Sequence, residues 1–306
     1  MKTLIALFVV VFAVGAYSQC TCDTMKWATC DGDPCQCTVL VGSNQKQVLD
    51  CKKLIPKCFL MKAEMHRARV GLSTRTIGGK PVETAFVDND GIYDPDCEAD
   101  GKFKAKQCNN TEECWCVNSA GVRRTDKGDK DMKCEKLVET YWVRLQLKHN
   151  ATSAAVDATK LKTGIENALL ERYGLAKNFV SEVQYDKDGR LIVVDVKKEK
   201  GDRTTDLSRM AYYMEKDVKV LPLFKSERPF EVSVEGQKLQ MENILVYYVD
   251  EEPPAFTMRR LTGGVIAVIV VVVLVVIGGL LILYFVRRRE QAQYRKAQGR
   301  EMEPMS

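Results

Sequence analysis

The residues best suited to chemistry are three cysteines in the stretch QCNNTEECWCVNSAGVRRTDKG, at 107–128. Cys108, Cys114 and Cys116 lie close together, and Trp115 stands between the last two. Cysteines at such spacing bind a metal ion, form a redox dithiol, supply a nucleophile or join in structural disulfides. Which of these applies decides whether this part of the chain performs catalysis or recognition.

The shortage of histidine argues against the three reactive alternatives. The chain has two histidines, His66 and His149, and its closest cysteine spacing is C-x-C, whereas zinc sites use C-x₂₋₄-C. A redox dithiol uses C-x-x-C in a βαβ unit, and a catalytic cysteine needs an unpaired thiol beside a histidine. A G-x-S-x-G motif for Ser-His-Asp chemistry is missing. We therefore predict structural disulfides, with no metal, no cofactor and no enzymatic activity.

The distribution of the cysteines divides the chain into a cysteine-rich part and a cysteine-free part. An even, dense set in a secreted segment is typical of a disulfide framework. Each set of six allows 15 pairings, and spacing alone does not choose among them. The first set is Cys20, Cys22, Cys30, Cys35, Cys37 and Cys51, and the second is Cys58, Cys97, Cys108, Cys114, Cys116 and Cys134.

The two ends of the chain predict secretion and a membrane anchor. Residues 1–18 have a basic start, a short apolar stretch and small residues before a cleavage site between Ser18 and Gln19. The apolar run at 263–286 is long enough to cross a bilayer as one helix. The basic tail at 287–306 is then cytoplasmic and faces anionic lipid. We predict a type I membrane protein whose net charge of +5 is partly a topology signal and does not indicate nucleic-acid binding.

The cysteine-free region, 135–250, has to fold by core packing alone, and its patterns predict an α+β domain. Alternating apolar residues predict strands, apolar residues at helical spacing predict helices, and Gly174 suits the end of the first helix. The order is βαββαββ, which favours an antiparallel-rich sheet with both helices on one face. The expected strands are 141–148, 180–185, 191–196, 230–234 and 244–249, the helices are 161–169 and 207–214, and an Asp-Gly hairpin turn lies at 187–190.

Charged residues in this region are interpreted as solvated faces. No acid pair lies in an apolar run, where burial would tune its pKa for acid–base catalysis. After this region, Glu251-Glu252-Pro253-Pro254 begins a juxtamembrane stalk at 251–262, which we expect to be a stiff, extended connector. A sheet with one free face on such a stalk suits a partner surface.

The cysteine motif itself resembles a known module. Gln107-Cys108, Cys114-Trp115-Cys116-Val117, Gly121 and Cys134 are similar to the thyroglobulin type 1 repeat, and the stretches 93–97 and 103–108 extend the likeness. This gives a cysteine-rich N-terminal domain at 19–57 and a thyroglobulin type 1 domain at 58–134. The order of all parts, together with stretches such as Ala211-Tyr212-Tyr213 and 247–251, resembles the family of epithelial cell adhesion molecules and tumour-associated calcium signal transducers.

The resemblance implies a pairing for every cysteine and a structural role for Trp115, which would pack over the bridges. The implied disulfides are Cys20–Cys35, Cys22–Cys51, Cys30–Cys37, Cys58–Cys97, Cys108–Cys114 and Cys116–Cys134.

Two kinds of modification site follow from the sequence and the resemblance. Asn109 and Asn150 each begin an Asn-x-Thr acceptor sequence, so both are expected to be surface sites of N-glycosylation. The basic stretch 66–80 is expected to be a solvated loop, and the family likeness implies cleavage there by trypsin-like proteases. Its candidate residues are Arg67, Arg69 and Arg75.

The resemblance also implies a function. It predicts an epithelial cell-surface adhesion and signalling glycoprotein of the plasma membrane, at lateral cell–cell contacts, that forms a cis homodimer through the thyroglobulin loop and the partner's cysteine-free domain. It implies association with claudin-type membrane proteins through the span, where Val275 stands four positions before Gly279 in place of a small residue. It further implies shedding and then intramembrane cleavage by proteases. The alternative is a thyroglobulin-module inhibitor of cysteine proteases.

Overall fold

A computed structural model describes residues 20–72, 93–109, 112–152, 154–219, 222–256 and 263–301. The chain forms two compact units, one ending at Ala255 and one beginning at Phe256. The predicted signal peptide, its cleavage site at Ser18 and Gln19, and the candidate cleavage residue Arg75 lie outside the described residues.

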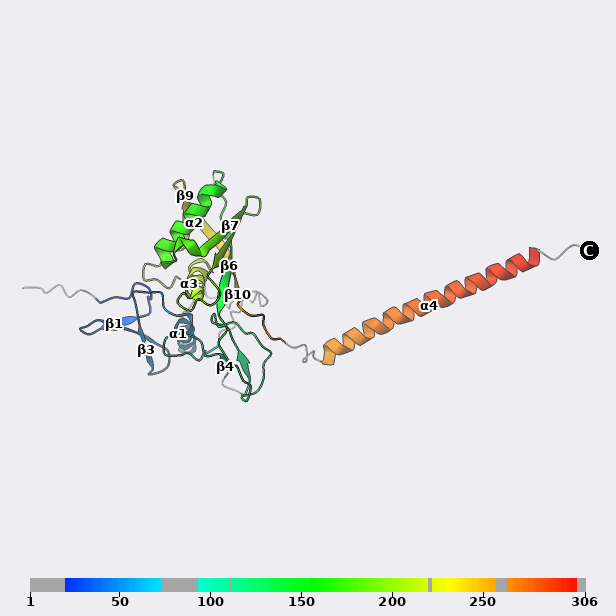
Figure 1. The fold of residues 1–306 in the computed structure, drawn as a ribbon, viewed down its shortest axis with the longest axis horizontal. Helices are drawn as coiled ribbons and strands as arrows, with labels where there is room; N and C mark the ends of the chain where they lie inside the picture. Colours follow the sequence, from blue (N-terminus) through cyan, green and yellow to red (C-terminus); the bar gives the residue numbers. More distant parts are fainter. Residues whose placement is uncertain are drawn as a thin grey trace, which may run out of the picture. The chain divides into compact units, whose positions relative to one another are not determined.

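The N-terminal module contains a small antiparallel sheet (Figure 1). Three disulfides crosslink this module. Its strands are β1 (Thr29–Asp31), β2 (Gln36–Leu40) and β3 (Lys46–Leu49), in the order β1-β2-β3. Short strands bury little apolar surface, so a module of this size needs crosslinks or a neighbour to stabilise it. It has both, because its buried side chains join the core of the cysteine-free domain.

The second module begins with a helix, α1 (Lys57–Arg69), and continues with the short antiparallel strands β4 (Lys106–Cys108) and β5 (Cys114–Cys116). Pro56 precedes the first helical residue, where its fixed φ suits entry to a helix. Because α1 extends to Arg69, the predicted loop at 66–80 is wrong in its first four residues. His66 is buried and Arg67 lies over the ring of Trp27, so tertiary contacts continue the helix through a basic stretch that looked like a loop.

The cysteine-free domain has the predicted βαββαββ order. Its five strands form one antiparallel sheet in the order β7-β8-β6-β10-β9. Asp157 caps the first helix by accepting hydrogen bonds from the N–H groups of Thr159 and Lys160, and Gly174 ends it with φ of +67°. The elements are β6 (Thr140–His149), α2 (Ala158–Tyr173), η1 (Lys177–Phe179), β7 (Val180–Asp186), β8 (Leu191–Lys197), α3 (Leu207–Lys219), β9 (Glu231–Val234) and β10 (Gln237–Asp250).

Both helices pack on the same face of this sheet. On β6 the side chains of Val143, Leu145 and Leu147 are fully buried, and they belong to one cluster with Leu161 of α2 and Met214 of α3. The residues that alternate with them on β6 are partly exposed. The sheet therefore has a covered face and an open face, as the alternation predicts.

Two details of the sheet differ from the sequence-based expectation. The β7–β8 hairpin has its left-handed residue at Arg190, with φ of 53°, and not at the Asp-Gly pair. A Cβ at Gly189 would lie 2.7 Å from an Asp186 carboxylate oxygen, so a larger residue there would displace that side chain. Strand β10 also begins at Gln237, well before the expected 244, because a tight turn at Glu235-Gly236, both with positive φ, pairs its polar first part with β9.

The second unit contains one long helix, α4 (Gly263–Glu301). Within it, 23 residues from Ala267 to Arg289 are long and apolar enough to cross a membrane, and none of this window is buried. The predicted span at 263–286 thus falls on a helix of sufficient length. The helix continues beyond the apolar stretch into the basic tail.

Candidate functional site

The cluster of Cys108, Cys114 and Cys116 lies in a hairpin that is closed by a disulfide. Strands β4 and β5 place Gln107 opposite Trp115 and Cys108 opposite Cys114. Cys108 is bonded to Cys114 across the hairpin, and Cys116 is bonded to Cys134. The remaining bridges, Cys20–Cys35, Cys22–Cys51, Cys30–Cys37 and Cys58–Cys97, complete the same six pairs that the family likeness implies.

Every cysteine of the chain lies within the described residues and is in a disulfide. The N-terminal module holds two groups of three sulfurs whose atoms lie within 4.8 Å of one another. Such spacing would suit a metal ion if the sulfurs were thiolates. Because these sulfurs are already bonded in pairs, each group consists of sulfurs from neighbouring disulfides and is not a metal site. They are Cys20, Cys35 and Cys37, and Cys22, Cys37 and Cys51.

Trp115 is part of a small core at the centre of the thyroglobulin-like module. The edge of Tyr93 meets its indole with ring centroids 5.4 Å apart, and Phe103 and Val117 complete the buried cluster with Cys58. The Tyr93 hydroxyl donates to the carbonyl of Gly121. Burial raises the pKa of Tyr93, which keeps this donor protonated. The indole is therefore packed as core and does not present a stacking platform for a ligand.

Gln107 is a residue whose role the motif alone did not reveal. Its side chain is fully buried, and its Oε1 accepts from the N–H of Asp96 at 2.7 Å. Its Nε2 donates to the carbonyl of Asp96 at 2.9 Å and to that of Lys104 at 2.7 Å. One amide thus joins the segment before Cys97 to strand β4. Only a side chain with both an acceptor and two donors can make this set of bonds.

A polar junction joins the thyroglobulin-like module to the cysteine-free domain. Its centre is Asp250, the last residue of β10, which accepts from Asn118, Thr140 and Arg124 at 2.8 to 2.9 Å. Burial raises the pKa of Asp250 above its usual value, and these hydrogen bonds oppose that rise. Asn118 also accepts from the N–H groups of Ala120 and Val122, which fixes the turn after β5.

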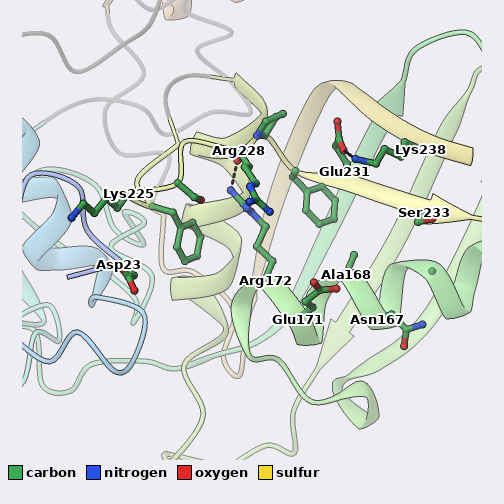
Figure 2. A pocket seen from close by; sticks show the side chains of 15 residues that line it. Asp23, Asn167, Ala168, Glu171, Arg172, Lys225, Arg228, Glu231, Ser233 and Lys238 are labelled. Carbon is green, nitrogen blue, oxygen red and sulfur yellow. Dashed lines mark hydrogen bonds and ion pairs between the residues drawn. The ribbon is translucent and has the colours of Figure 1, made fainter. Parts of the chain in front are cut away.

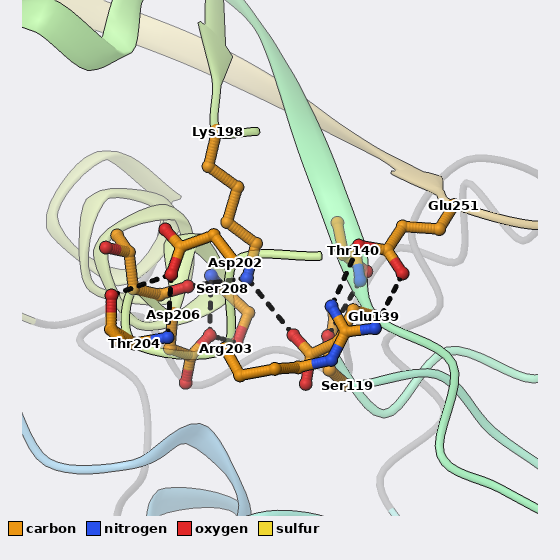
Figure 3. A network of polar contacts seen from close by, with 12 residues as sticks. Ser119, Glu139, Thr140, Lys198, Asp202, Arg203, Thr204, Asp206, Ser208 and Glu251 are labelled. Carbon is orange, nitrogen blue, oxygen red and sulfur yellow. Dashed lines mark hydrogen bonds and ion pairs between the residues drawn. The ribbon is translucent and has the colours of Figure 1, made fainter. Parts of the chain in front are cut away.

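Beside this junction lies a second polar network (Figure 3). Arg203 donates both terminal nitrogens to Glu251 at 2.8 Å, and the N–H of Gly201 donates to the same carboxylate. The Arg203 hydrogen bond is the main reason that the pKa of Glu251 falls to about 2. Lys198 is buried and donates to Glu139 at 3.1 Å. The segment after β10, where we expected a stiff, extended connector to begin, is thus fixed to the domain at Glu251.

The interpretation of all charged residues as solvated faces is wrong for α3. Asp217 is buried and accepts from Arg172 at 2.6 Å and from Tyr173 at 2.7 Å. Burial raises the pKa of Asp217, against the effect of these donors. Lys216 is buried as well and donates to Glu64 of α1 at 2.9 Å. The polar side of α3 is thus covered by α2 at Asp217 and by α1 at Lys216, which local periodicity does not reveal.

A groove of about 1240 Å³ lies along α2 and the segment 224–233 (Figure 2). Arg172 reaches across from α2 and donates to the carbonyl of Arg228. Lys238 on the other side is paired with Glu231 at 3.0 Å. The groove carries charges of both signs, and none of the sites predicted from the sequence lies in it.

The predicted modification residues that the structure describes lie on a helix or directly after a strand. Arg67 and Arg69 lie in the last turn of α1, and Arg69 forms an ion pair with Asp94 at 2.8 Å. Neither therefore belongs to the loop in which cleavage was expected. Asn109 is partly exposed directly after β4, and Asn150 is exposed directly after β6, so both acceptor residues lie at strand ends accessible to solvent.

The open face of the sheet carries three rows of side chains across β8, β6 and β10. The register aligns Val193, Gln146 and Leu245 in one row, and Lys197, Trp142 and Val249 in another. Between them, Arg144 donates to Asp195 at 2.7 and 2.9 Å, and its opposite neighbour is Tyr247, 36% of which is exposed. The face is thus a mixture of partly exposed apolar side chains and one tight ion pair.

Comparison with known proteins agrees with this architecture. A model of the thyroglobulin type-1 repeat matches residues 70–135, and a model of the EPCAM/Trop-2 C-terminal family matches 140–250. Human tumor-associated calcium signal transducer 2 is 41% identical over 81% of this chain and 76% of its own length. Epithelial cell adhesion molecule is 42% identical in mouse, over 80% of this chain and 78% of its length, and 40% identical in human, over 81% and 77%. The chain belongs to the family of epithelial cell adhesion molecules and tumor-associated calcium signal transducers.

Proposed function

We propose that this chain is a type I cell-surface adhesion and signalling protein that works by homotypic association. Its relatives are named as an adhesion molecule and a signal transducer, and the apolar helix found among the described residues suits a membrane crossing. The proposed role is not enzymatic, which is supported by the pairing of every cysteine in a disulfide.

The open face of the sheet is the observation that carries the proposal. Trp142, Leu245 and Tyr247 leave apolar surface partly exposed there, opposite the face that α2 and α3 cover. Contiguous exposed apolar surface bounded by charges is typical of protein interaction sites. We assign this face to the contact with the thyroglobulin-like module of a second copy, in a dimer formed on one membrane.

The mass of the extracellular part, residues 19–256, in solution tests this assignment. We expect a dimer at micromolar concentration, and we expect Tyr247→Asp to shift it to monomer, because an unpaired carboxylate would be buried at the interface. Leu170→Asp is the matched control, since Leu170 is similarly exposed but lies on α2. A wild-type protein that stays monomeric, or two variants that behave alike, would contradict the assignment.

We further propose that Asn109 and Asn150 carry N-glycans. Proteolysis then releases the extracellular part, and intramembrane cleavage frees the cytoplasmic tail. The membrane span is proposed to contact claudin-type partners. Because Val275 stands four residues before Gly279, close helix approach at this position is restricted. Substitution of Val275 by Gly should therefore strengthen capture of a claudin-type protein, measured by co-purification from one membrane.

The match to the thyroglobulin type-1 repeat supports one alternative function, inhibition of cysteine proteases. Titration of a lysosomal cysteine protease with residues 19–256 distinguishes the two. Adhesion as the main function predicts no loss of protease activity at equimolar concentration. Tight stoichiometric inhibition would replace adhesion as the preferred function.

A further inference from the structure

The segment that leaves the sheet toward the membrane helix is docked on the thyroglobulin-like module. The N–H of Ala255 donates to the carbonyl of Arg124 at 2.9 Å, and Thr125 and Ala255 form a parallel β-bridge. We call residues 250–255 the docked segment. Its partner is the stretch 123–125, which lies far away in sequence. Backbone pairing of this kind is how a sheet edge accepts an extended peptide.

A single guanidinium fixes most of the docked segment. Arg124 donates through Nε to Asp250 at 2.8 Å, and through Nη2 to the carbonyls of Glu252 at 2.7 Å and Pro253 at 2.9 Å. Its side chain is only 11% exposed, and that of Asp250 is 10% exposed. Hydrogen bonds from a charged, largely desolvated donor are stronger than those between neutral groups. Arg124 therefore holds the segment at three successive points.

The position of Arg124 is itself rigid. Its N–H donates to the carbonyl of Cys116 at 2.8 Å, and the Thr125 hydroxyl accepts from the N–H of Cys116 at 3.0 Å. Cys116 is crosslinked to Cys134. The guanidinium thus extends from a segment that the disulfide framework holds in place.

A second anchor comes from the cysteine-free domain. Glu251 receives both terminal nitrogens of Arg203, and its own N–H donates to the carbonyl of Glu139 at 2.9 Å (Figure 3). Lys136 also pairs with the side chain of Glu252. The docked segment is therefore held on two sides, by Arg124 and by Arg203.

We propose that the thyroglobulin-like module acts as a latch that shields the juxtamembrane segment from proteolysis, with Arg124 as its closing residue. A protease binds its substrate as an extended chain and needs local unfolding of a segment whose backbone groups are already paired. Release of Arg124 would free residues 250–255 and expose the chain just before the membrane helix. The proposal rests on the single-pass topology proposed above, but it does not require self-association.

Limited proteolysis of the full-length chain in lipid nanodiscs tests the latch. Discs that hold one chain remove any shielding by a second copy. A broad-specificity protease is added, and cuts within 251–256 are timed by mass spectrometry. We expect Arg124→Ala to be cut there about tenfold faster than wild type, since it loses charge-assisted hydrogen bonds at a partly buried site. Lys104→Ala, which removes an exposed cation from the same module, should match wild type.

Two further variants separate the latch from general unfolding. Arg124→Lys keeps the charge but not the forked donor geometry, so its cutting rate should lie between those of wild type and Arg124→Ala. Arg203→Ala loosens the other anchor without touching the thyroglobulin-like module, and should raise cutting about threefold. Hydrogen exchange in β4 and β5 reports whether that module stays folded.

The outcomes are distinct. Faster cutting within 251–256, with β4 and β5 still protected from exchange, supports the latch. Equal cutting rates in wild type and Arg124→Ala overturn it. If Arg124→Ala unfolds the module, the result depends on Arg203→Ala, and an unchanged rate in that variant also overturns the proposal. A monomeric protein in the mass measurement would defeat homotypic association and leave these rates as expected.

Discussion

The cysteine-rich part, residues 20–134, and the cysteine-free domain are stabilised by different means. The first contains six disulfides and, in its thyroglobulin-like module, a small cluster around Trp115. The second has a continuous core with fully buried residues from the sheet and from both helices. Within one chain, crosslinks therefore fix the shape of the small modules, and the larger domain provides the core on which they dock.

The two cysteine-rich modules share some of their contacts with that domain and differ in others. The N-terminal module shares its apolar core, and Tyr213 of α3 bonds to the backbone of both Thr24 and Ile55. The thyroglobulin-like module also reaches this core, through Phe59, Leu60 and Ala63 of α1, and it is attached in addition through the polar junction around Asp250 and Arg124. Water offers no substitute for buried apolar contacts, whereas the hydrogen bonds of a polar junction can be exchanged for bonds to water. For this reason the latch is placed at the polar junction and not at the shared apolar core.

The largest expected effect is on the core of the cysteine-free domain. Leu145→Ala in β6 removes a fully buried side chain and should lower the free energy of unfolding by about 4 kcal/mol. Leu170→Ala, which changes an exposed leucine on α2, should cost less than about 0.5 kcal/mol. Hydrogen exchange of β6 and β8 amides measures both. Equal effects of the two variants would show that this core does not provide the stability of the domain.

The next effect concerns the disulfides. Replacing Cys116 and Cys134 by Ser opens a link of sequence separation 18 and should cost the thyroglobulin-like module about 3 kcal/mol by the chain-entropy estimate. The same change at Cys108 and Cys114, separated by 6, should cost about 2 kcal/mol.

Module-resolved hydrogen exchange checks this ranking. Exchange of β6 and β8 amides should stay as in wild type in both double variants, because the core of the sheet carries no disulfide. Loss of protection in β6 and β8 would show that the cysteine-rich part and the cysteine-free domain unfold as one unit and are not stabilised separately.

At the apolar junction the expected effect is smaller. Tyr213→Phe removes the hydroxyl that accepts from the N–H of Ile55 and donates to the carbonyl of Thr24. A buried donor without a partner should cost about 2 kcal/mol. Tyr247→Phe, on the open face, is the control and should be nearly neutral. Thermal unfolding of residues 19–256 measures both, and equal melting temperatures would contradict a structural role for this hydroxyl.

Sequence patterns predicted the elements that depend on local chemistry. The βαββαββ order follows from alternating and helical spacing, and Gly174 from the need for a left-handed residue. The patterns failed where distant segments determine the structure. Helix α1 buries the polar residues Glu64 and His66, so no apolar stripe marks it. The buried Lys216 of α3 has its partner on α1, 152 residues away, which no local window reveals.

The candidate site likewise has features that the local sequence predicts and contacts that it does not. The likeness to a thyroglobulin type 1 repeat identified the bridged hairpin and the packed Trp115, because those features lie within one motif. It did not identify Arg124 or Asp250 as partners, since 126 residues separate them. Asn118 carried a weak signal, an Asn at the start of a turn ending in Gly121, which predicts a local turn and not its contact with Asp250.

The smallest effect is a difference in pH dependence between the neighbouring acids Asp250 and Glu251. The hydrogen bond from Arg203 lowers the pKa of Glu251 to about 2, so Glu251 stabilises the folded chain above its unfolded pKa of 4.5, and this is lost as pH falls toward about 2. Burial raises the pKa of Asp250, so the folded chain takes up a proton there first, and its stability rises as pH falls toward the unfolded value of 3.8.

Opposite slopes should therefore appear in two single variants, measured by urea unfolding from pH 7 to pH 3. The stability advantage of wild type over Glu251→Gln should shrink below about pH 4.5, by at most about 1 kcal/mol because Arg203 is half exposed. Its advantage over Asp250→Asn should grow between pH 7 and pH 4, since only the wild type gains stability from protonation at this position. Parallel pH slopes for the two variants would mean that Asp250 and Glu251 share one environment. The docked segment would then not have a buried attachment point at Asp250 that differs from a surface anchor at Glu251.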